Sequence, residues 1–263
     1  PGIRHVTFTG SVPTGIRVMQ SAAANVTSVV LELGGKSPLI VMADADMDAA
    51  AEGVLGAIYE NAGQICSAGS RLVVERKVHA ELVERLAVRA SGLKLGHGLR
   101  RPQVGALSSG AHLDKVAGYV EGARGRGIAI AAGGERATDP ESGTGWFFQP
   151  TILDTVRADD PVIQEEIFGP VLSVQVVEGE EEAVAIANGT DFGLVAGIYT
   201  RDFGRAHRMA RDIDAGQVYI NEYFAGGIEV PFGGNKLSGF GREKGFEALR
   251  SYTRTKSLAA KIS

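Results

Sequence analysis

The sequence lacks the features of a membrane protein or a nucleic-acid-binding protein. No apolar run approaches the ~18 residues of a membrane-spanning helix. The formal net charge of -4 over 263 residues provides no basic field for nucleic acid or an anionic membrane surface. We therefore predict that neither nucleic acid nor membrane is a partner of this protein.

Cysteine is almost missing, because Cys66 is the only one in the chain. A single cysteine excludes an intrachain disulfide and fits a reducing compartment, so we predict a cytoplasmic protein. The five histidines lie far apart, and no cysteine or histidine stands at ligand spacing from another. The sequence therefore predicts no metal site.

A starting methionine and a lead-in to the first element are also missing. The chain begins "PGIRHVTFTG", and an apolar β-like run starts almost at once. We interpret this beginning as a cut within a fold.

Apolar runs of β type alternate with segments of helical periodicity, and many of the 36 glycines stand between them. The pattern predicts strands at 6–9, 27–33, 37–42, 71–75, 128–134, 145–153, 170–177, 194–200 and 216–221. It predicts helices at 16–25, 47–59, 78–90, 113–127, 181–188 and 202–214. This alternation predicts an α/β fold with a parallel or mixed sheet. From Gly239 onward the sequence is polar and weakly periodic, which predicts a surface arm.

Two residues are candidates for catalysis. Cys66 lies in "ENAGQICSAGSR", where it is either a small buried hydrophobe or a nucleophile, and these residues alone do not decide. Glu32 lies in the apolar run "VVLELGG". Burial there would raise its pKa and suit it to act as a general base, whereas on an edge strand it would face water. The Gly-Gly that follows favours the first interpretation, since it permits close approach of the backbone.

Three further segments are candidates for binding. "GSVPTG", from Gly10 to Gly15, follows a strand and opens a helix, so it is either a pyrophosphate-binding turn or a plain turn. "EEIFGPVL" offers a carboxylate for a ribose, or simple charge at a helix end. In "VPFGGNKLSGFGRE", Phe232 precedes a Gly-Gly turn and is a candidate pocket wall.

Taken together, these segments resemble the aldehyde dehydrogenase superfamily. The blocks "FTGSVPTG", "LELGGKSP", "NAGQICSAGSR", "EEIFGP" and "PFGGNKLSGFGRE" follow the order usual in that family. The resemblance implies that Cys66 is the nucleophile and Glu32 the general base. It implies a cofactor site for NAD or NADP at Gly10, Ser11, Gly15, Leu33, Glu166 and Phe168, with Glu166 on the nicotinamide ribose and Phe168 beside the ring. It places Phe232 and Asn221 at the substrate pocket, although Asn221 equally suits the end of a strand.

The mechanism implied by the resemblance begins with attack of the Cys66 thiolate on a small-molecule aldehyde. Hydride passes to the cofactor, and water activated by Glu32 hydrolyses the thioester on Cys66. The alternatives are a thiol esterase that needs no cofactor and a non-catalytic remnant that only pairs with other subunits.

The resemblance also implies a domain arrangement. Residues 1–33 match the end of a Rossmann-like dinucleotide-binding domain, 34–236 a catalytic domain, and 237–263 a segment that returns to the nucleotide domain and ends in an oligomerisation strand. We expect a homo-oligomer. We also expect that most of the cofactor domain and an oxyanion-binding Asn lie outside this sequence, so that the chain alone is inactive.

Overall fold

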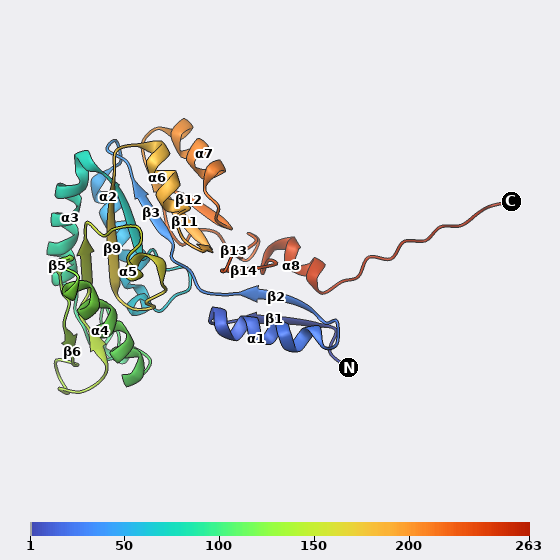
Figure 1. The fold of residues 1–263 in the computed structure, drawn as a ribbon, viewed down its shortest axis with the longest axis horizontal. Coiled ribbons are helices and arrows are strands. Elements are labelled where there is room, and N and C mark those ends of the chain that lie inside the picture. Colours follow the sequence, from blue (N-terminus) through green and yellow to red (C-terminus); the bar gives the residue numbers. More distant parts are fainter. Residues whose placement is uncertain (1) are drawn as a thin grey trace.

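The computed structural model describes residues 2–263, so Pro1, at the start of the first predicted domain range, lies outside the described residues. The larger sheet has seven strands in the order β12-β11-β3-β4-β9-β8-β5 (Figure 1). These are β3 (Pro38–Val41), β4 (Arg71–Glu75), β5 (Ala129–Ala132), β8 (Thr151–Asp154), β9 (Val171–Val177), β11 (Val195–Tyr199) and β12 (Gln217–Ile220). All neighbours are parallel except β5 and β8, which confirms the predicted α/β fold with a mixed sheet.

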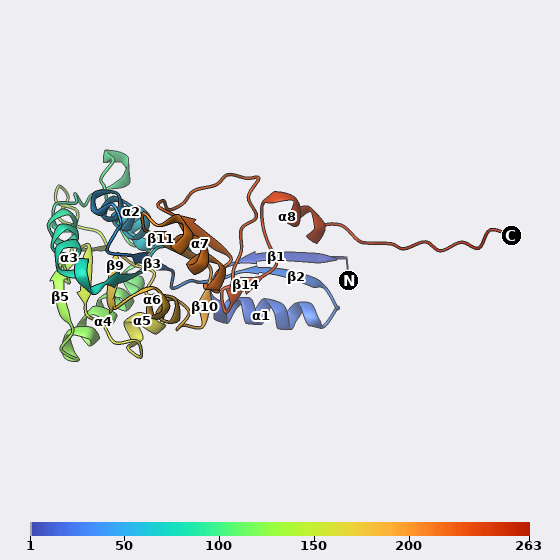
Figure 2. The ribbon, with the colours of Figure 1, turned by 90° about the horizontal axis from the view of Figure 1, so that it is seen from above.

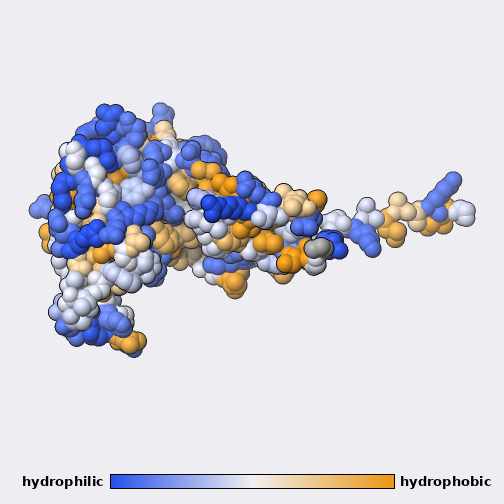
Figure 3. All heavy atoms as spheres, turned by 60° about the horizontal axis from the view of Figure 1, so that its bottom comes forward, coloured by the Kyte–Doolittle hydropathy of each residue, from blue (hydrophilic) through white to orange (hydrophobic). Residues whose placement is uncertain are grey.

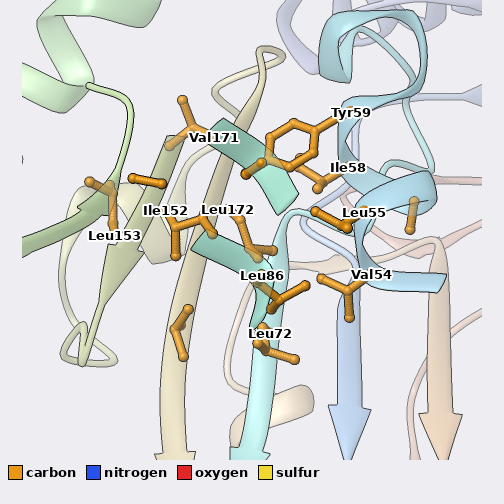
Figure 4. Close-up of a cluster of buried hydrophobic side chains, with 14 of the residues drawn as sticks. Val54, Leu55, Ile58, Tyr59, Leu72, Leu86, Ile152, Leu153, Val171 and Leu172 are labelled. Atoms are coloured by element: carbon orange, nitrogen blue, oxygen red, sulfur yellow. The ribbon is translucent and has the colours of Figure 1, made fainter. Parts of the chain in front are cut away.

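Helices cover both faces of this sheet. One face is covered by α2 (Met47–Tyr59), α3 (Arg76–Ser91) and α4 (Gly110–Gly125). The other face is covered by α6 (Glu180–Ala187) and α7 (Phe203–Asp212). Residues 39–42, in and directly after β3, are all apolar because both faces of the sheet are covered. Leu39 and Val41 pack in the core on the α2, α3 and α4 side (the first core), whereas Ile40 and Met42 pack in the core on the α6 and α7 side (the second core). Figure 4 shows the first core, where Leu72 and Leu172 of the sheet lie beside side chains of α2 and α3.

A smaller sheet lies beside the seven-stranded sheet and its helices. It contains β1 (His5–Thr9), β2 (Ser28–Glu32) and β14 (Gly239–Phe240), with α1 (Val12–Ala23) between β1 and β2. Strands β1 and β2 are parallel, and β14 is antiparallel to β2. Figures 1 and 2 show this unit as the narrow part of the molecule, from which the last residues extend away. Figure 3 shows apolar residues on its surface, and Ile16, Met19 and Phe240 are exposed there.

The structure differs most from the sequence prediction at three places. The helix predicted over 16–25 begins at Val12, because Ser11 is the N-cap and Pro13 fits the first turn. The run 145–153 is two strands, β7 (Phe147–Phe148) and β8, interrupted at Pro150, which has no N–H for a ladder. The segment from Gly239 is not only a surface arm, since β14 joins the smaller sheet and α8 (Gly245–Ser251) follows.

Short elements complete the chain. They are the 3-10 helices η1 (Glu60–Gly63) and η2 (Gly98–Arg100), helix α5 (Pro161–Gln164), strand β6 (Arg136–Ala137), which pairs with β7, and strands β10 (Phe192–Gly193) and β13 (Asn235–Lys236), which pair with each other. Within residues 2–263, no helix is long and apolar enough to cross a membrane.

The register of the two sheets determines which loops meet. Thr9 pairs with Glu32, so the carboxyl ends of β1 and β2 lie together. Pro38 pairs with Arg71, and Arg71 with Ser173, so the segments before β3, β4 and β9 also lie side by side.

Candidate active site

A cavity of about 450 Å³ lies between the ends of the two sheets. Its walls are Thr9, Gly10, Ser11, Glu32, Leu33, Gly34, Cys66, His112, Lys115, Glu166 and Phe168. Seven of the ten predicted site residues are among them, although they come from four separate segments of the chain. Most come from the carboxyl ends of β1 and β2 and from the loops before β3, β4 and β9.

A tight reversal of the backbone delivers Cys66 to this cavity. Helix α2 ends in η1, where Asn61, Ala62 and Gly63 all have positive φ. Asn61 Nδ2 donates to the carbonyl of Gln64 and holds the turn. Gly63 lies directly against the carbonyl of Gly169, where any side chain would clash. The cysteine loop therefore packs backbone to backbone on the segment that carries Glu166 and Phe168.

Gly34 and Gly35, which precede β3, contact both the Cys66 loop and the segment that carries Glu166. The backbone N–H of Gly35 donates to Glu166 Oε1 at 3.1 Å. A Cβ on Gly34 would overlap the Glu166 carboxylate, and one on Gly35 would overlap the carbonyl of Cys66. The two glycines are thus the surface on which the Cys66 loop and the Glu166 carboxylate both rest.

The surroundings of Cys66 do not favour a thiolate in the resting protein. Burial raises the pKa of the Cys66 thiol, and the charges of Glu166 and Glu32 raise it further. The backbone N–H groups of Ser67 and Cys66 oppose this rise. Because the thiolate is the reactive form of cysteine, a nucleophile needs groups that lower its pKa, and here only the two backbone N–H groups do so.

Glu32 is a buried carboxylate at the end of β2. It is 2% exposed, and neither of its oxygens has a hydrogen-bond partner among residues 2–263. Burial raises its pKa from 4.5 to about 8; nearby Glu243 adds to the rise and Arg242 opposes it. The interpretation as an edge-strand residue facing water is therefore wrong, because β2 lies between β1 and β14. The environment is that of a general base near neutrality.

Glu166 and Phe168 face the cavity from the irregular segment between α5 and β9. Burial raises the pKa of Glu166, whereas the N–H of Gly35 and the ammonium groups of Lys115 and Lys36 lower it. Phe168 has φ of 62°, an uncommon backbone state for a non-glycine residue. A carboxylate beside an aromatic ring suits a ribose diol joined to a planar heterocycle.

The turn at Gly10 and Ser11 opens α1. Ser11 is the N-cap, but its hydroxyl bonds Thr14 Oγ1 at 2.9 Å and leaves the helix N–H groups uncapped. The first turn contains no acidic residue. Such a helix N-terminus favours an anion such as a pyrophosphate. Gly10 also donates its N–H to the carbonyl of Glu32 at 3.0 Å, which ties this turn to the candidate base.

Three predicted site residues lie outside the cavity wall. Gly15 is buried in α1 and packs on Leu33. Asn221 uses its amide on both the N–H and the carbonyl of Thr200, at 3.0 Å each, which is a strand-end role. Phe232 pairs through its backbone with Glu243, at 2.7 Å in both directions.

Several groups at the site were missed from the sequence. Lys36 is 1% exposed, its Nζ has no partner among residues 2–263, and burial lowers its pKa to about 7. Tyr223 donates its hydroxyl to the carbonyl of Ser67 at 2.8 Å, next to Cys66 in the chain. His112 and Lys115 line the cavity from α4. The predicted helix over 113–127 contains Lys115 but begins one residue after His112, so their shared helix face could not be inferred.

Comparisons with known proteins agree with this geometry. Residues 1–258 match the model of the aldehyde dehydrogenase family. The chain is 43% identical to 4-trimethylaminobutyraldehyde dehydrogenase A of Danio rerio, over 100% of this chain and 52% of that protein. It is 46% identical to a betaine aldehyde dehydrogenase of Cereibacter sphaeroides, over 97% of this chain and 52% of that protein.

Solved structures give the same result. The NAD+ complex of an aldehyde dehydrogenase from Bacillus cereus superposes with a TM-score of 0.95 at 41% identity, covering 99% of this chain and 52% of that chain. The chain spans about half the length of the curated relatives it matches.

Proposed function

The chain belongs to the aldehyde dehydrogenase family, and we propose that it provides the catalytic residues that oxidise an aldehyde to a carboxylic acid with NAD+ or NADP+. The observation that carries the proposal is the convergence of Cys66, Glu32 and Glu166 on one cavity. A thiol, a base and a ribose-binding carboxylate are the groups that this reaction needs.

In the proposed reaction the Cys66 sulfur forms a bond to the aldehyde carbonyl carbon and gives a thiohemiacetal. A nicotinamide held in this cavity would supply the oxidation by taking up the hydride of that carbon. The acyl group then remains on Cys66 as a thioester. Glu32 takes a proton from water, and the water oxygen displaces the thiolate to release the acid.

The chain has a suitable group for each part of the cofactor's reactive half. The α1 N-terminus with Gly10 and Ser11 would face the pyrophosphate, and Glu166 Oε2, which no hydrogen bond from residues 2–263 occupies, would accept from the ribose. Phe168 would lie beside the ring, and Leu33 adds an apolar wall. Gly15 supports this turn through its packing on Leu33.

The two pKa shifts fit an order of events. With a pKa of about 8, Glu32 is largely protonated at pH 7, so its charge opposes ionisation of the Cys66 thiol mainly at higher pH. The same carboxyl becomes an effective base as the pH rises toward 8. A positively charged oxidised nicotinamide in the cavity would further favour the thiolate.

The alternative of a cofactor-free thiol esterase explains Cys66 and Glu32 but leaves Glu166, Phe168 and the α1 N-terminus without a role.

For the domains, we propose the boundaries 1–33, 34–236 and 237–263, supported by the end of β2 at Glu32 and the start of β3 at Pro38. Phe232 and Asn221 stay proposed pocket residues. We further propose a homo-oligomer, because Phe246, Leu258 and Ile262 of the C-terminal segment are exposed, and a cytoplasmic site, because the single thiol is free.

The first substrates to test are betaine aldehyde and 4-trimethylaminobutyraldehyde, for which the relatives are named. In the complete enzyme, Cys66→Ala should abolish NADH formation from either aldehyde. Oxidation at a rate comparable to the unmodified enzyme would contradict the proposal.

A further inference from the structure

Helix α4 presents three hydrogen-bonding side chains along one stripe, at spacings of three and four residues. His112 Nε2 lies 2.6 Å from the carbonyl oxygen of Phe168. Lys115 Nζ donates to the carbonyl of Glu166 at 2.9 Å. Tyr119 donates its hydroxyl to the carboxylate of Glu165 at 2.5 Å. Side chains at this spacing lie on one face of a helix, so together they form a continuous edge.

The segment that they contact has no regular structure of its own. It runs from the end of α5 at Gln164 to the start of β9 at Val171. Its residues meet the α4 stripe in reverse order, 168, 166 and 165 against 112, 115 and 119. Val116 of α4 packs against Gly169 at the end of the segment, and the ring of His112 lies edge-on to Phe168 at 6.0 Å. Two backbone carbonyls, one carboxylate and two packing contacts therefore attach the segment to the helix.

We propose that His112, Lys115 and Tyr119 are positioning residues that clamp the 165–168 segment and so fix Glu166 and Phe168 in the cavity. The significance of this clamp for catalysis rests on the function proposed above. The contacts themselves do not, since each joins two residues of this chain.

The clamp bonds the backbone of Glu166 and not its carboxylate, and this has a chemical consequence. The Lys115 ammonium bonds the backbone oxygen of Glu166, and among residues 2–263 no ion pair joins Lys115 to the Glu166 carboxylate. The carboxylate is held only at Oε1, by the N–H of Gly35. The segment is thus restrained through its backbone, while the other carboxylate oxygen keeps its capacity to accept hydrogen bonds from a diol.

The test is cleavage of the folded 263-residue chain by a protease specific for glutamate. Cleavage after Glu166 requires the segment to leave the helix, and its rate follows the population of that open state when reclosing is fast. Lys115→Met should cleave after Glu166 on the order of 10-fold faster, the factor expected for one lost hydrogen bond from a charged donor. Lys115→Arg keeps the donor and should restore the original rate. His112→Leu and His112→Gln form a second pair with the same expectation.

Controls separate a local from a global effect. Cleavage after Glu229, in an exposed loop, is measured in the same digest, and Lys77→Met on α3 removes a matched exposed lysine. Tyr119→Phe changes only one hydroxyl and covers the case in which Lys115→Met does not fold. Equal cleavage after Glu166 in wild type and in both Lys115→Met and Tyr119→Phe would overturn the clamp, as would an increase that Lys115→Arg does not restore. Either result leaves the proposed chemistry of Cys66 unaffected, since no cofactor or substrate takes part.

Discussion

The buried carboxyl of Glu32 predicts an unusual dependence of folding stability on pH. Its folded pKa is about 8, against 4.5 in an exposed chain, mainly because burial disfavours the ionised form. Between these two pH values the folded protein holds a proton that the unfolded chain has lost. The contribution of this bound proton to the free energy of unfolding is complete below pH 4.5 and is lost as the pH rises through 8. The difference of about 3.5 pH units, at ~1.36 kcal/mol per unit, gives up to about 5 kcal/mol.

Replacement by glutamine isolates this contribution. Glu32→Gln resembles the protonated carboxyl in size and cannot ionise, so it should not lose stability over this range. Urea unfolding followed by far-UV circular dichroism at pH 5, 6, 7 and 8 gives the free energy of unfolding of each protein. The advantage of the variant should grow by about 3.5 kcal/mol in total between pH 5 and pH 8, most steeply between pH 6 and pH 7. A constant difference across these pH values would mean that Glu32 titrates as an exposed carboxyl, and the desolvation argument for a general base would fail.

Three further results are expected. Lys36→Met should stabilise the fold most below pH 7, because the folded wild-type protein there holds a buried, unpartnered charge. Since burial lowers the pKa of this lysine from 10.5 to about 7, the advantage of the variant should shrink as the pH rises toward 10.5. Equal gains in the free energy of unfolding at pH 6 and pH 10, measured by urea unfolding, would contradict this. The 263-residue chain alone should bind NADH weakly and self-associate, since it spans about half the length of its relatives and exposes apolar residues on α1 and α8; micromolar affinity in a fluorescence titration, together with a monomer in analytical ultracentrifugation, is the opposite result. The complete enzyme should release a free acid if Glu32 is the base that we propose, because that base would activate water; with coenzyme A present, acyl-CoA formation faster than acid release would refute this.

Local sequence patterns were sufficient for most of the fold. Helix α2 and strand β4 have the predicted bounds, because Asp46 caps the former and the apolar run defines the latter. The missed elements depend on distant partners. Strand β14 is only two residues long and exists because β2 offers an edge to Gly239 and Phe240, and no periodicity in that segment could indicate this.

The candidate site shows the same division. Cys66, Glu32 and Glu166 could be named from their motifs, and the cavity brings them together. The raised pKa of Cys66 could not be inferred, because it depends on burial in the folded protein and on carboxylates far away in the sequence. The α4 stripe was also not recognised, because His112, Lys115 and Tyr119 acquire meaning only when the segment near residue 166 packs on them.

The central claim is that Cys66 carries the acyl group, and peptide mass mapping of the trapped enzyme tests it most directly. The complete enzyme with Glu32→Gln is mixed with aldehyde and NAD+ and quenched during the first turnover. Because hydrolysis is slowed and hydride transfer is not, a burst of NADH should accompany an acyl adduct on the peptide that contains Cys66. A burst of NADH with Cys66 unmodified, or with the acyl group on another residue, would contradict the account.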